Sequence, residues 1–329
     1  MDARATRWRL AGALSLIVAL FTLSACGGAT TDSGGPAATG PRIRIAVGID
    51  AAYAPFFVAD SKGLWRKHGL NVEVVQFGRG GEAVDAIAGG QVQMAGSSDT
   101  TTIAQLQQNP SLRALLIYQE SGQYLKVVAG PKTGSPSEIK KVAIVPGLSE
   151  LAMTKYLESK KIDVKSVTFV TADPPEIPAL LQKGEVDAYT LWEPWPANGV
   201  KLGGKVLEST GAYGLKYQHW LITGQKWLSA NEGTAAKVAQ VLQEATALVE
   251  SDPDAAAEAT QKAAKVPPEQ TMTAIREIDF KVRDITPADM KGYESTAAWY
   301  VSTGKVKATP NLNAAVLQGW VAANAKGTG

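Results

Sequence analysis

Short apolar strands alternate with helical segments along residues 42–192, and this pattern constrains the fold most strongly. Apolar residues occupy every second position of Arg42–Ile49, as in a strand with one buried face. Strands that alternate with helices indicate a mostly parallel α/β sheet. The expected strands are Arg42–Ile49, Val72–Phe77, Gln91–Ala95, Leu112–Tyr118, Tyr124–Ala129, Val142–Val145, Ser166–Val170 and Val186–Trp192.

Helices are expected between these strands and throughout the region after Leu221. Thr234–Glu250 has the clearest helical stripe, since its apolar residues recur every three or four positions. Asp252 and Pro253 form a cap and first-turn pair for the helix that follows. The other expected helices are Pro55–Lys67, Gly81–Ala88, Thr100–Gln108, Ser149–Ser159, Glu176–Gln182, Pro268–Ile278, Pro287–Val301 and Asn313–Ala325.

A weak internal repeat relates the two halves of the strand-rich region. At a constant offset of 94 residues, Gly90 corresponds to Gly184 and Asp99 to Glu193. Each copy reads as a helix, a glycine stop, a buried strand and an acid just past the end of the strand. The pattern predicts two related lobes, and convergent α/β patterning is the alternative. In either case both acids lie at the carboxyl ends of strands, where open α/β sheets bind ligands.

The first 41 residues predict export and membrane anchoring. Three Arg precede a short apolar run that ends at Leu23-Ser24-Ala25-Cys26, which is typical of a signal peptide rather than a structural helix. Cys26 is the only cysteine of the chain, and its position predicts a lipoprotein signal peptide over 1–25 with lipidation of the Cys26 thiol. An ordinary signal peptide with a chance cysteine is the alternative. Residues 26–41, rich in Gly, Thr, Ala and Pro, are expected to be a flexible tether.

The charge and the reactive residues of the chain disfavour several function classes. Removal of residues 1–25 leaves 30 basic and 30 acidic side chains, so the mature chain is nearly neutral and does not favour nucleic-acid binding. The chain has only two histidines, His68 and His219, and no phosphate-binding GxxxxGK[ST] loop. We therefore expect no enzyme activity, no cofactor and no metal.

Polar and aromatic residues near strand ends are the candidates for a ligand site. Ser97, Ser98, Asp99 and Thr100 join a buried strand to a helix, where capping of that helix by Asp99 or Thr100 is the alternative role. Ser149 opens the corresponding helix of the second lobe, and for it capping and ligand contact stay equally open. Aromatic walls with a few aimed polar groups are typical of small-molecule pockets. On this basis the further candidates are Tyr53, Tyr124, Trp192, Glu193 and Trp220.

The order of several short motifs resembles the solute-binding proteins of ABC importers, in the nitrate, sulfonate, taurine and thiamine-pyrimidine-precursor group. Tyr53-Ala54-Pro55 is similar to the group's opening, and Gly90–Met94 with Gly96-Ser97-Ser98 is similar to its first ligand loop. Asp173-Pro174-Pro175 and Gly184–Ala188, which runs into Trp192-Glu193-Pro194, resemble its second-lobe signature.

The resemblance implies a two-lobed periplasmic-binding-protein-like fold with mixed, mostly parallel sheets and two hinge crossovers. Lobe I is expected over 42–128 and 224–329, and lobe II over 129–223. The resemblance also implies ligand contact by Ser97, Ser98, Ser149 and Glu193, and less directly by Tyr53, Asp99, Thr100, Tyr124 and Trp220.

The expected function is solute capture outside the cytoplasm by lobe closure, with delivery to a cognate ABC permease. The protein is expected to be a lipid-anchored monomer at the cell surface or in the periplasm. Asp99 and Glu193, with no basic partner in either loop, disfavour a bare inorganic anion. We therefore expect an aminosulfonate or aminopyrimidine, with an amine or ring N–H near Glu193 and stacking on Trp192 or Trp220. The alternatives are an enzyme of thiamine-pyrimidine metabolism and a surface lipoprotein without a transport role.

Overall fold

The computed structural model describes residues 40–78 and 80–326, which belong to one unit of the chain, 35–329. The expected signal peptide, Cys26 and most of the tether lie outside the described residues. No helix within the described part of the chain is both long and apolar enough to cross a membrane.

The first sheet has five strands in the order β2-β1-β3-β10-β4. β1 pairs in parallel with β2 and β3, whereas β10 lies antiparallel between β3 and β4. The first lobe therefore has a mixed sheet, with three adjacent parallel strands on one side and the antiparallel strand β10 next to them. Its strands are β1 (Ile43–Val47), β2 (Val72–Gln76), β3 (Met94–Ser98), β4 (Leu112–Ser121) and β10 (Tyr217–Gly224).

The second sheet repeats this arrangement, with the order β7-β6-β8-β5-β9. β6 pairs in parallel with β7 and β8, and β5 lies antiparallel between β8 and β9. The two strands β3 and β8 begin and end 94 residues apart, which is the offset of the sequence repeat. The strands of this second lobe are β5 (Leu125–Ala129), β6 (Lys141–Ile144), β7 (Thr168–Thr171), β8 (Ala188–Trp192) and β9 (Lys205–Ser209).

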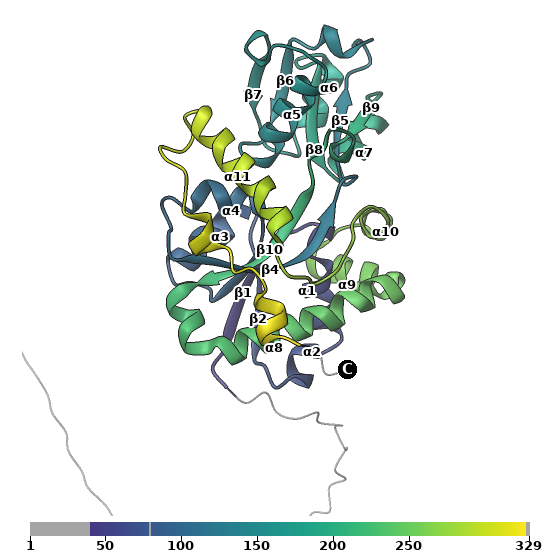
Figure 1. Cartoon of the computed structure of the whole chain (residues 1–329). Helices are drawn as coiled ribbons and strands as arrows, with labels where there is room; N and C mark the ends of the chain where they lie inside the picture. Colours follow the sequence, from purple (N-terminus) through teal and green to yellow (C-terminus); the bar gives the residue numbers. More distant parts are fainter. Residues whose placement is uncertain (1–39, 79, 327–329) are drawn as a thin grey trace, which may run out of the picture. The chain divides into compact units, whose positions relative to one another are not determined.

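Helices cover both faces of the first sheet (Figure 1). Buried side chains of α1, α8 and α9 form one hydrophobic cluster with the sheet, and those of α3, α4 and α11 form another. The first-lobe helices are η1 (Ala51–Tyr53), α1 (Ala54–Ser61), α2 (Leu64–Lys67), α3 (Gly80–Ala88), α4 (Asp99–Gln105), α8 (Gln225–Ser251), α9 (Pro253–Ala264), α10 (Pro268–Glu277), α11 (Pro287–Ser302), α12 (Leu312–Ala315) and α13 (Trp320–Asn324).

Shorter helical segments belong to the second sheet and its connections. Two hydrophobic clusters, built around Val127 and Val128, form the core on the two faces of that sheet. The segments are η2 (Pro136–Glu138), α5 (Leu148–Ser159), η3 (Val164–Ser166), α6 (Ile177–Lys183), α7 (Trp195–Lys201) and η4 (Thr210–Tyr213).

The predicted two-lobed α/β fold is confirmed, and the differences are local. Two expected helices are each split in two by a glycine with positive φ, Gly63 between α1 and α2 and Gly319 before α13. L-residues with a side chain rarely adopt this backbone conformation, so the helix does not continue through it. The sequence pattern does not predict β10 as a strand, because polar residues interrupt the alternation of apolar residues along it.

Two crossovers carry the chain between the sheets, after β4 and before β10. The sheet pairings place β5 in the second lobe and β10 in the first, so the changes of lobe come several residues earlier than the expected boundaries at 128–129 and 223–224. The crossovers touch at two glycines, where the Gly211 N–H donates to the Gly122 carbonyl oxygen at 2.7 Å. A Cβ on Gly211 would lie 2.9 Å from that oxygen, so no larger residue fits without moving backbone.

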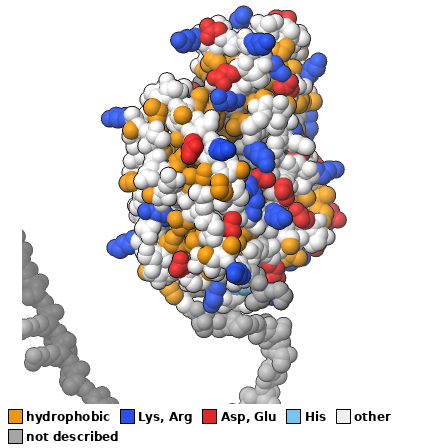
Figure 2. Space-filling model, in the orientation of Figure 1, with side chains coloured by type: hydrophobic (Ala, Val, Ile, Leu, Met, Phe, Trp, Pro, Cys, Tyr) orange, Lys and Arg blue, Asp and Glu red, His pale blue; other side chains and the backbone are white. Residues whose placement is uncertain are grey.

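The outer surface shows no large area of a single charge on the face drawn in Figure 2, where basic and acidic side chains are interspersed. This agrees with the near neutrality of the chain that follows residue 25.

We predict that Gly211→Ala destabilises the protein by about 1–3 kcal/mol, because the new methyl group pushes on the backbone of the other crossover. The measurement is the free energy of unfolding from denaturant titration. Gly292→Ala is the matched control, since a Cβ on this α11 residue meets nothing within 4 Å. We expect that change to be neutral or to stabilise by roughly 0.5–1 kcal/mol. Equal stability of the two variants would contradict the close packing of the crossovers.

Candidate functional site

The turn from β3 into α4 buries the first group of predicted site residues. Ser98 is the N-cap of α4, and its hydroxyl accepts the Thr101 N–H at 3.2 Å. The Thr102 hydroxyl lies 3.2 Å from the Ser97 hydroxyl and 2.9 Å from the Ser98 carbonyl oxygen. The capping role expected of Asp99 or Thr100 therefore belongs to Ser98. These hydroxyls already bond to one another and to the helix start.

Asp99 is a buried carboxyl group in the first turn of α4. The backbone N–H groups of Thr100 and Gln218 donate to it, and the Thr100 hydroxyl lies 3.2 Å away. Desolvation nevertheless raises the pKa of Asp99 to about 7, and the nearby Asp289 carboxylate adds to the rise. Near neutral pH this group is therefore poised between its charged and neutral forms.

Ser149 performs a structural role in the second lobe. Its hydroxyl donates to the Thr190 carbonyl oxygen at 2.6 Å and accepts the Val145 N–H at 3.1 Å. These bonds fasten the start of α5 to β8 and to the loop that follows β6. The side chain is buried, so it shapes the site through the backbone around it.

Glu193 has a basic partner that its own loop does not supply. Lys126 Nζ lies 2.6 Å from Glu193 Oε1, and the Ala197 N–H donates to Oε2 at 3.2 Å. Lys126 comes from β5, which pairs with β8 in antiparallel register and so places the lysine beside the end of β8. Both carboxylate oxygens of Glu193 thus already accept hydrogen bonds from the protein, and the pairing of Glu193 with a ligand amine stays a prediction.

The same lysine joins the two lobes. Lys126 Nζ lies 2.6 Å from Glu277 Oε1 at the end of α10, in the first lobe. Desolvation raises the pKa of Glu277, although the Lys126 charge opposes the rise. Tyr124 contributes a second link, because its hydroxyl donates to the Glu193 carbonyl oxygen at 3.0 Å and lies 3.5 Å from Asp50.

Apolar contacts and a further ion pair also join the lobes. Leu148 and Ala152 of α5 are buried in the same hydrophobic cluster as α1 and α8, although α5 belongs to the second sheet. Lys305 and Glu150 form an ion pair of 2.9 Å between the lobes. The structure thus shows the two lobes in contact, with polar groups of both buried between them.

Trp220 is not available for stacking on a ligand. It is fully buried on the α11 face of β10, and its indole N–H donates to the Tyr293 hydroxyl at 3.0 Å. The predicted stacking role of Trp220 is therefore wrong, because successive strand residues face opposite sides and His219 takes the other side. Trp192 is only partly buried and packs against clusters of both lobes, so it remains the aromatic candidate.

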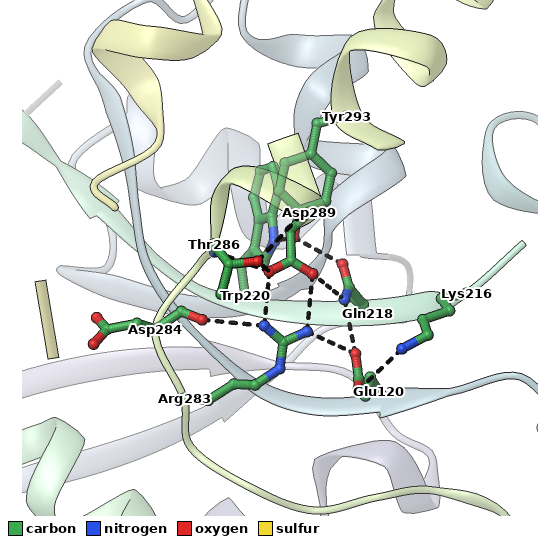
Figure 3. Close-up of polar contacts among 9 residues, drawn as sticks. All are labelled: Glu120, Lys216, Gln218, Trp220, Arg283, Asp284, Thr286, Asp289 and Tyr293. Atoms are coloured by element: carbon green, nitrogen blue, oxygen red, sulfur yellow. Dashed lines mark hydrogen bonds and ion pairs between the residues drawn. The ribbon is translucent and has the colours of Figure 1, made fainter. Parts of the chain in front are cut away.

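A polar network holds the start of α11 onto β4 and β10 (Figure 3). The Arg283 guanidinium donates to both oxygens of Asp289 and to Glu120, at 2.7–2.9 Å. Gln218 donates to Glu120 and Asp289 and accepts from Tyr293. Although desolvation opposes it, donors from Arg283 lower the pKa of Asp289. We call these contacts the α11 clasp. The α11 clasp covers the buried Trp220 side chain and holds α11 against β10.

A cluster of aromatic residues lies on the opposite face of β10, and only part of it is predictable from the sequence. The His219 ring lies 4.9 Å from Tyr53, 5.6 Å from Tyr118 and 4.6 Å from Tyr217, and Tyr124 stacks on Tyr217 at 5.9 Å between ring centroids. His219 Nδ1 is hydrogen-bonded to the Tyr118 hydroxyl at 2.7 Å. Desolvation lowers the pKa of His219 to about 3, so its ring is neutral at physiological pH. We call these five residues the tyrosine cluster.

Two glycines make room for these rings. A Cβ on Gly48 would lie 2.4 Å from the Tyr53 ring, and one on Gly96 would lie 2.7 Å from the Tyr118 hydroxyl. Both glycines lie at or near the carboxyl ends of parallel strands. Tyr53 was a candidate because it is an aromatic residue just past the first strand. The distant strand partners Tyr118 and Tyr217 gave no comparable local signal.

Asp50 lies beside the tyrosine cluster and was not among the predicted site residues. It caps η1 by accepting the Ala52 N–H at 2.8 Å. Desolvation by the surrounding protein raises the pKa of Asp50 to about 6. Among the described residues, no basic side chain forms an ion pair with it. The arrangement of hydroxyls, rings and a carboxylate suits recognition of a small polar molecule.

Comparisons with known proteins show the family of this chain. A family model described as NMT1/THI5 like matches residues 50–256. A putative aliphatic sulfonates-binding protein of Bacillus subtilis (strain 168) is 27% identical over 224 residues, which are 61% of this chain and 64% of that protein. A taurine-binding periplasmic protein of Escherichia coli (strain K12) is 28% identical over 181 residues, 52% of this chain and 56% of that protein. The chain therefore spans less than two thirds of each of these relatives.

A solved structure shares the fold. The periplasmic aliphatic sulphonate binding protein SsuA from Escherichia coli superposes with a TM-score of 0.76 at 17% identity, and the match covers 85% of this chain and 93% of that one. At this level of identity the likeness concerns the fold alone.

We predict that Asp99 makes the protein less stable as the pH rises from about 4 to about 7. The ordinary pKa is 3.8 and the folded one about 7, so the folded state binds the proton more tightly across this window and loses that advantage on deprotonation. When the pKa of a group differs by one between the folded and unfolded states, the difference corresponds to roughly 1.4 kcal/mol. Over this pH range the free energy of unfolding should fall less for Asp99→Asn than for the wild type, because Asn does not titrate.

Denaturant titrations at about pH 5 and about pH 8 measure this difference. Asp163→Asn is the control, because Asp163 is exposed in the second lobe. If the pH dependence of Asp99→Asn equals that of the wild type, Asp99 titrates at its ordinary value and the prediction is wrong.

Proposed function

Because the chain belongs to the NMT1/THI5-like family, we propose that it is the extracytoplasmic solute-binding component of an ABC importer. In this proposal the protein captures a small polar solute between its lobes and delivers it to a cognate permease. Two relatives named for aliphatic sulfonates and taurine support the class of solute. The lobes close by rotation about the two crossovers, which is one of the common modes of ligand-driven domain motion.

The single observation that carries the proposal is that buried and partly buried charged groups from both lobes lie in one region. Lys126 and Glu193 come from the second lobe, and Glu277 comes from the first. Desolvation of charged groups is costly even when they are paired, so a purely structural interface would favour apolar side chains here. The narrow contact between Gly122 and Gly211 leaves the two lobes joined through thin crossovers, as a hinge requires.

An enzyme of thiamine-pyrimidine metabolism on the same fold is the alternative class, and no contact in the site favours it. Such an enzyme would resemble the family branch that uses a cysteine-rich motif and a reactive histidine. Cys26 is the only cysteine. The His219 ring is buried and neutral, with Nδ1 bonded to Tyr118, so it is poorly placed to exchange protons with a substrate.

The solute we propose is an aminosulfonate or an aminopyrimidine. Asp50, Glu193 and Glu277 surround Tyr124 with negative charge, and this disfavours a bare inorganic anion in the same place. An amine or a ring N–H of the solute would offset the negative charge of these carboxylates. Trp192 is the aromatic surface on which a flat solute could stack.

We predict that one member of a small panel stabilises the protein against heat. The panel contains taurine, ethanesulfonate, nitrate and an aminopyrimidine. At a hundredfold excess over its Kd, a true ligand should add about 2.7 kcal/mol to the unfolding free energy. The mass of any small molecule that copurifies with the protein identifies a ligand outside the panel. If no solute stabilises the protein, nothing copurifies and an aminopyrimidine is instead converted to a product, the binding proposal fails.

We also propose that Cys26 is the lipidated N-terminus of the mature protein. The measurement is the intact mass of the N-terminal peptide from membrane-extracted protein. We expect that peptide to begin at Cys26 and to carry added acyl mass. Cys26→Ser should carry no such mass, because the thiol is absent, while the tether variant Ser33→Ala should remain acylated. An unmodified wild-type peptide, or one that begins elsewhere, would exclude lipidation.

A further inference from the structure

We propose that the tyrosine cluster and Asp50 bind the positively charged end of the solute, a protonated amine or another cationic N–H group. This inference rests on the proposed function, and it assigns the recognition of charge to Asp50 rather than to Glu193. It also separates this protein from a receptor whose binding energy comes mainly from a sulfonate or nitrate anion.

Negative charge around Tyr124 exceeds the positive charge that offsets it. Three carboxylates, Asp50, Glu193 and Glu277, act electrostatically on the Tyr124 hydroxyl. Lys126 lies 2.6 Å from both glutamates and offsets them, and the charge of Arg276 also acts on Glu277. Asp50 has no such partner among the residues that the structure describes, so the region keeps an excess of negative charge. A cation that enters beside Asp50 would offset it.

The tyrosine rings beside Asp50 are buried and form an environment that suits a cation. The Tyr124 hydroxyl lies 3.5 Å from Asp50, and the Tyr124 ring stacks on Tyr217 at 5.9 Å between ring centroids. Tyr53 and Tyr217 both contact the His219 ring. The faces of tyrosine rings attract cations, and aromatic cages of this kind recognise ammonium groups. His219, another ring of the cluster, is neutral and so does not repel a cation.

A buried amide beside the cluster has no protein partner. Gln119 is fully buried, and neither its Nε2 nor its Oε1 has a hydrogen-bond partner within the described part of the chain. Gln119 pairs with His219 across the β4–β10 ladder, and side chains of directly opposed residues lie on the same face of a sheet. Buried polar atoms are rarely left unbonded. The Gln119 side-chain carbonyl oxygen is therefore suited to accept an N–H from the same solute.

The start of α4 is a poor place for the anionic end of a solute. Ser98 accepts the Thr101 N–H and Thr102 bonds to the Ser98 carbonyl oxygen, so these groups are already engaged. Asp99 occupies the first turn, where its carboxylate would repel a bound anion. A negative group of a zwitterionic solute is therefore expected to lie farther from these acids than its amine.

The test compares three small molecules that share a two-carbon skeleton: ethylammonium, taurine and ethanesulfonate. The first carries only the amine, the last carries only the sulfonate, and taurine carries both. Binding of each to the full mature chain is measured by saturation-transfer NMR and by titration. We expect ethylammonium and taurine to bind and ethanesulfonate to bind at least 10-fold more weakly than taurine. Tighter binding of ethanesulfonate than of taurine, or no binding of ethylammonium, would overturn the proposal.

The Asp50 carboxylate is tested by a pair of matched variants. Asp50→Asn keeps the size and the capping ability of the side chain and removes its charge. We expect it to weaken ethylammonium binding about 10-fold or more, because hydrogen bonds to charged groups are the strong ones. Asp163→Asn is the control, since Asp163 also caps a short helix, η3, and lies in the second lobe. Equal affinity of the two variants for ethylammonium would overturn the role of Asp50.

Failure of this inference and failure of the proposed function give different results. If ethanesulfonate binds best and the wild-type protein is stabilised by it, the protein is still a solute receptor, but one that recognises an anion. If the protein copurifies with no solute, gains no stability from any panel member and converts one of them, the receptor function itself is lost.

Discussion

The contact between the two crossovers is the constraint on which the rest of the structure depends. Gly122 and Gly211 approach so closely that a backbone hydrogen bond of 2.7 Å joins them, and neither position has room for a side chain. Every strand of the second sheet lies between these two points in the sequence. The second lobe is therefore an insertion between the two crossovers, which touch at this point. Each sheet keeps its own ladder of backbone hydrogen bonds.

The ion pairs of Lys126, close to the crossovers, link the two lobes to each other and to the candidate site. Lys126 binds Glu193 within the second lobe and Glu277 of the first lobe, so a movement of one lobe would change the surroundings of a partly buried lysine. Buried ion pairs add little net stability, because desolvation offsets the attraction between the charges. These ion pairs instead fix the position of Glu193. They hold its carbonyl oxygen beside the Tyr124 hydroxyl, which also approaches Asp50.

Local sequence patterns predicted most of the elements but few of the contacts. The alternation in β1 and the helical stripe of α8 are properties of a single segment, and both were found. The two strand-end acids were also found, because a repeated helix–glycine–strand pattern places Asp99 and Glu193 in corresponding positions. Lys126 was missed as the partner of Glu193, because 67 residues separate them and only the β5–β8 pairing brings them together. Trp220 was misassigned because adjacent strand residues face opposite sides, and only the packing of α11 shows which side holds the core.

The sequence by itself determined the class of fold, the number of lobes and the chemical types of residue near the strand ends, because periodicity and strand-end position are local properties. The tertiary structure alone decided which of these residues meet. The insertion of β10 between β3 and β4 brings His219 to Tyr53 and Tyr118, and the antiparallel β5 brings Lys126 to Glu193. These contacts depend on strand pairing between distant segments, which gives Glu193 a basic partner from another strand.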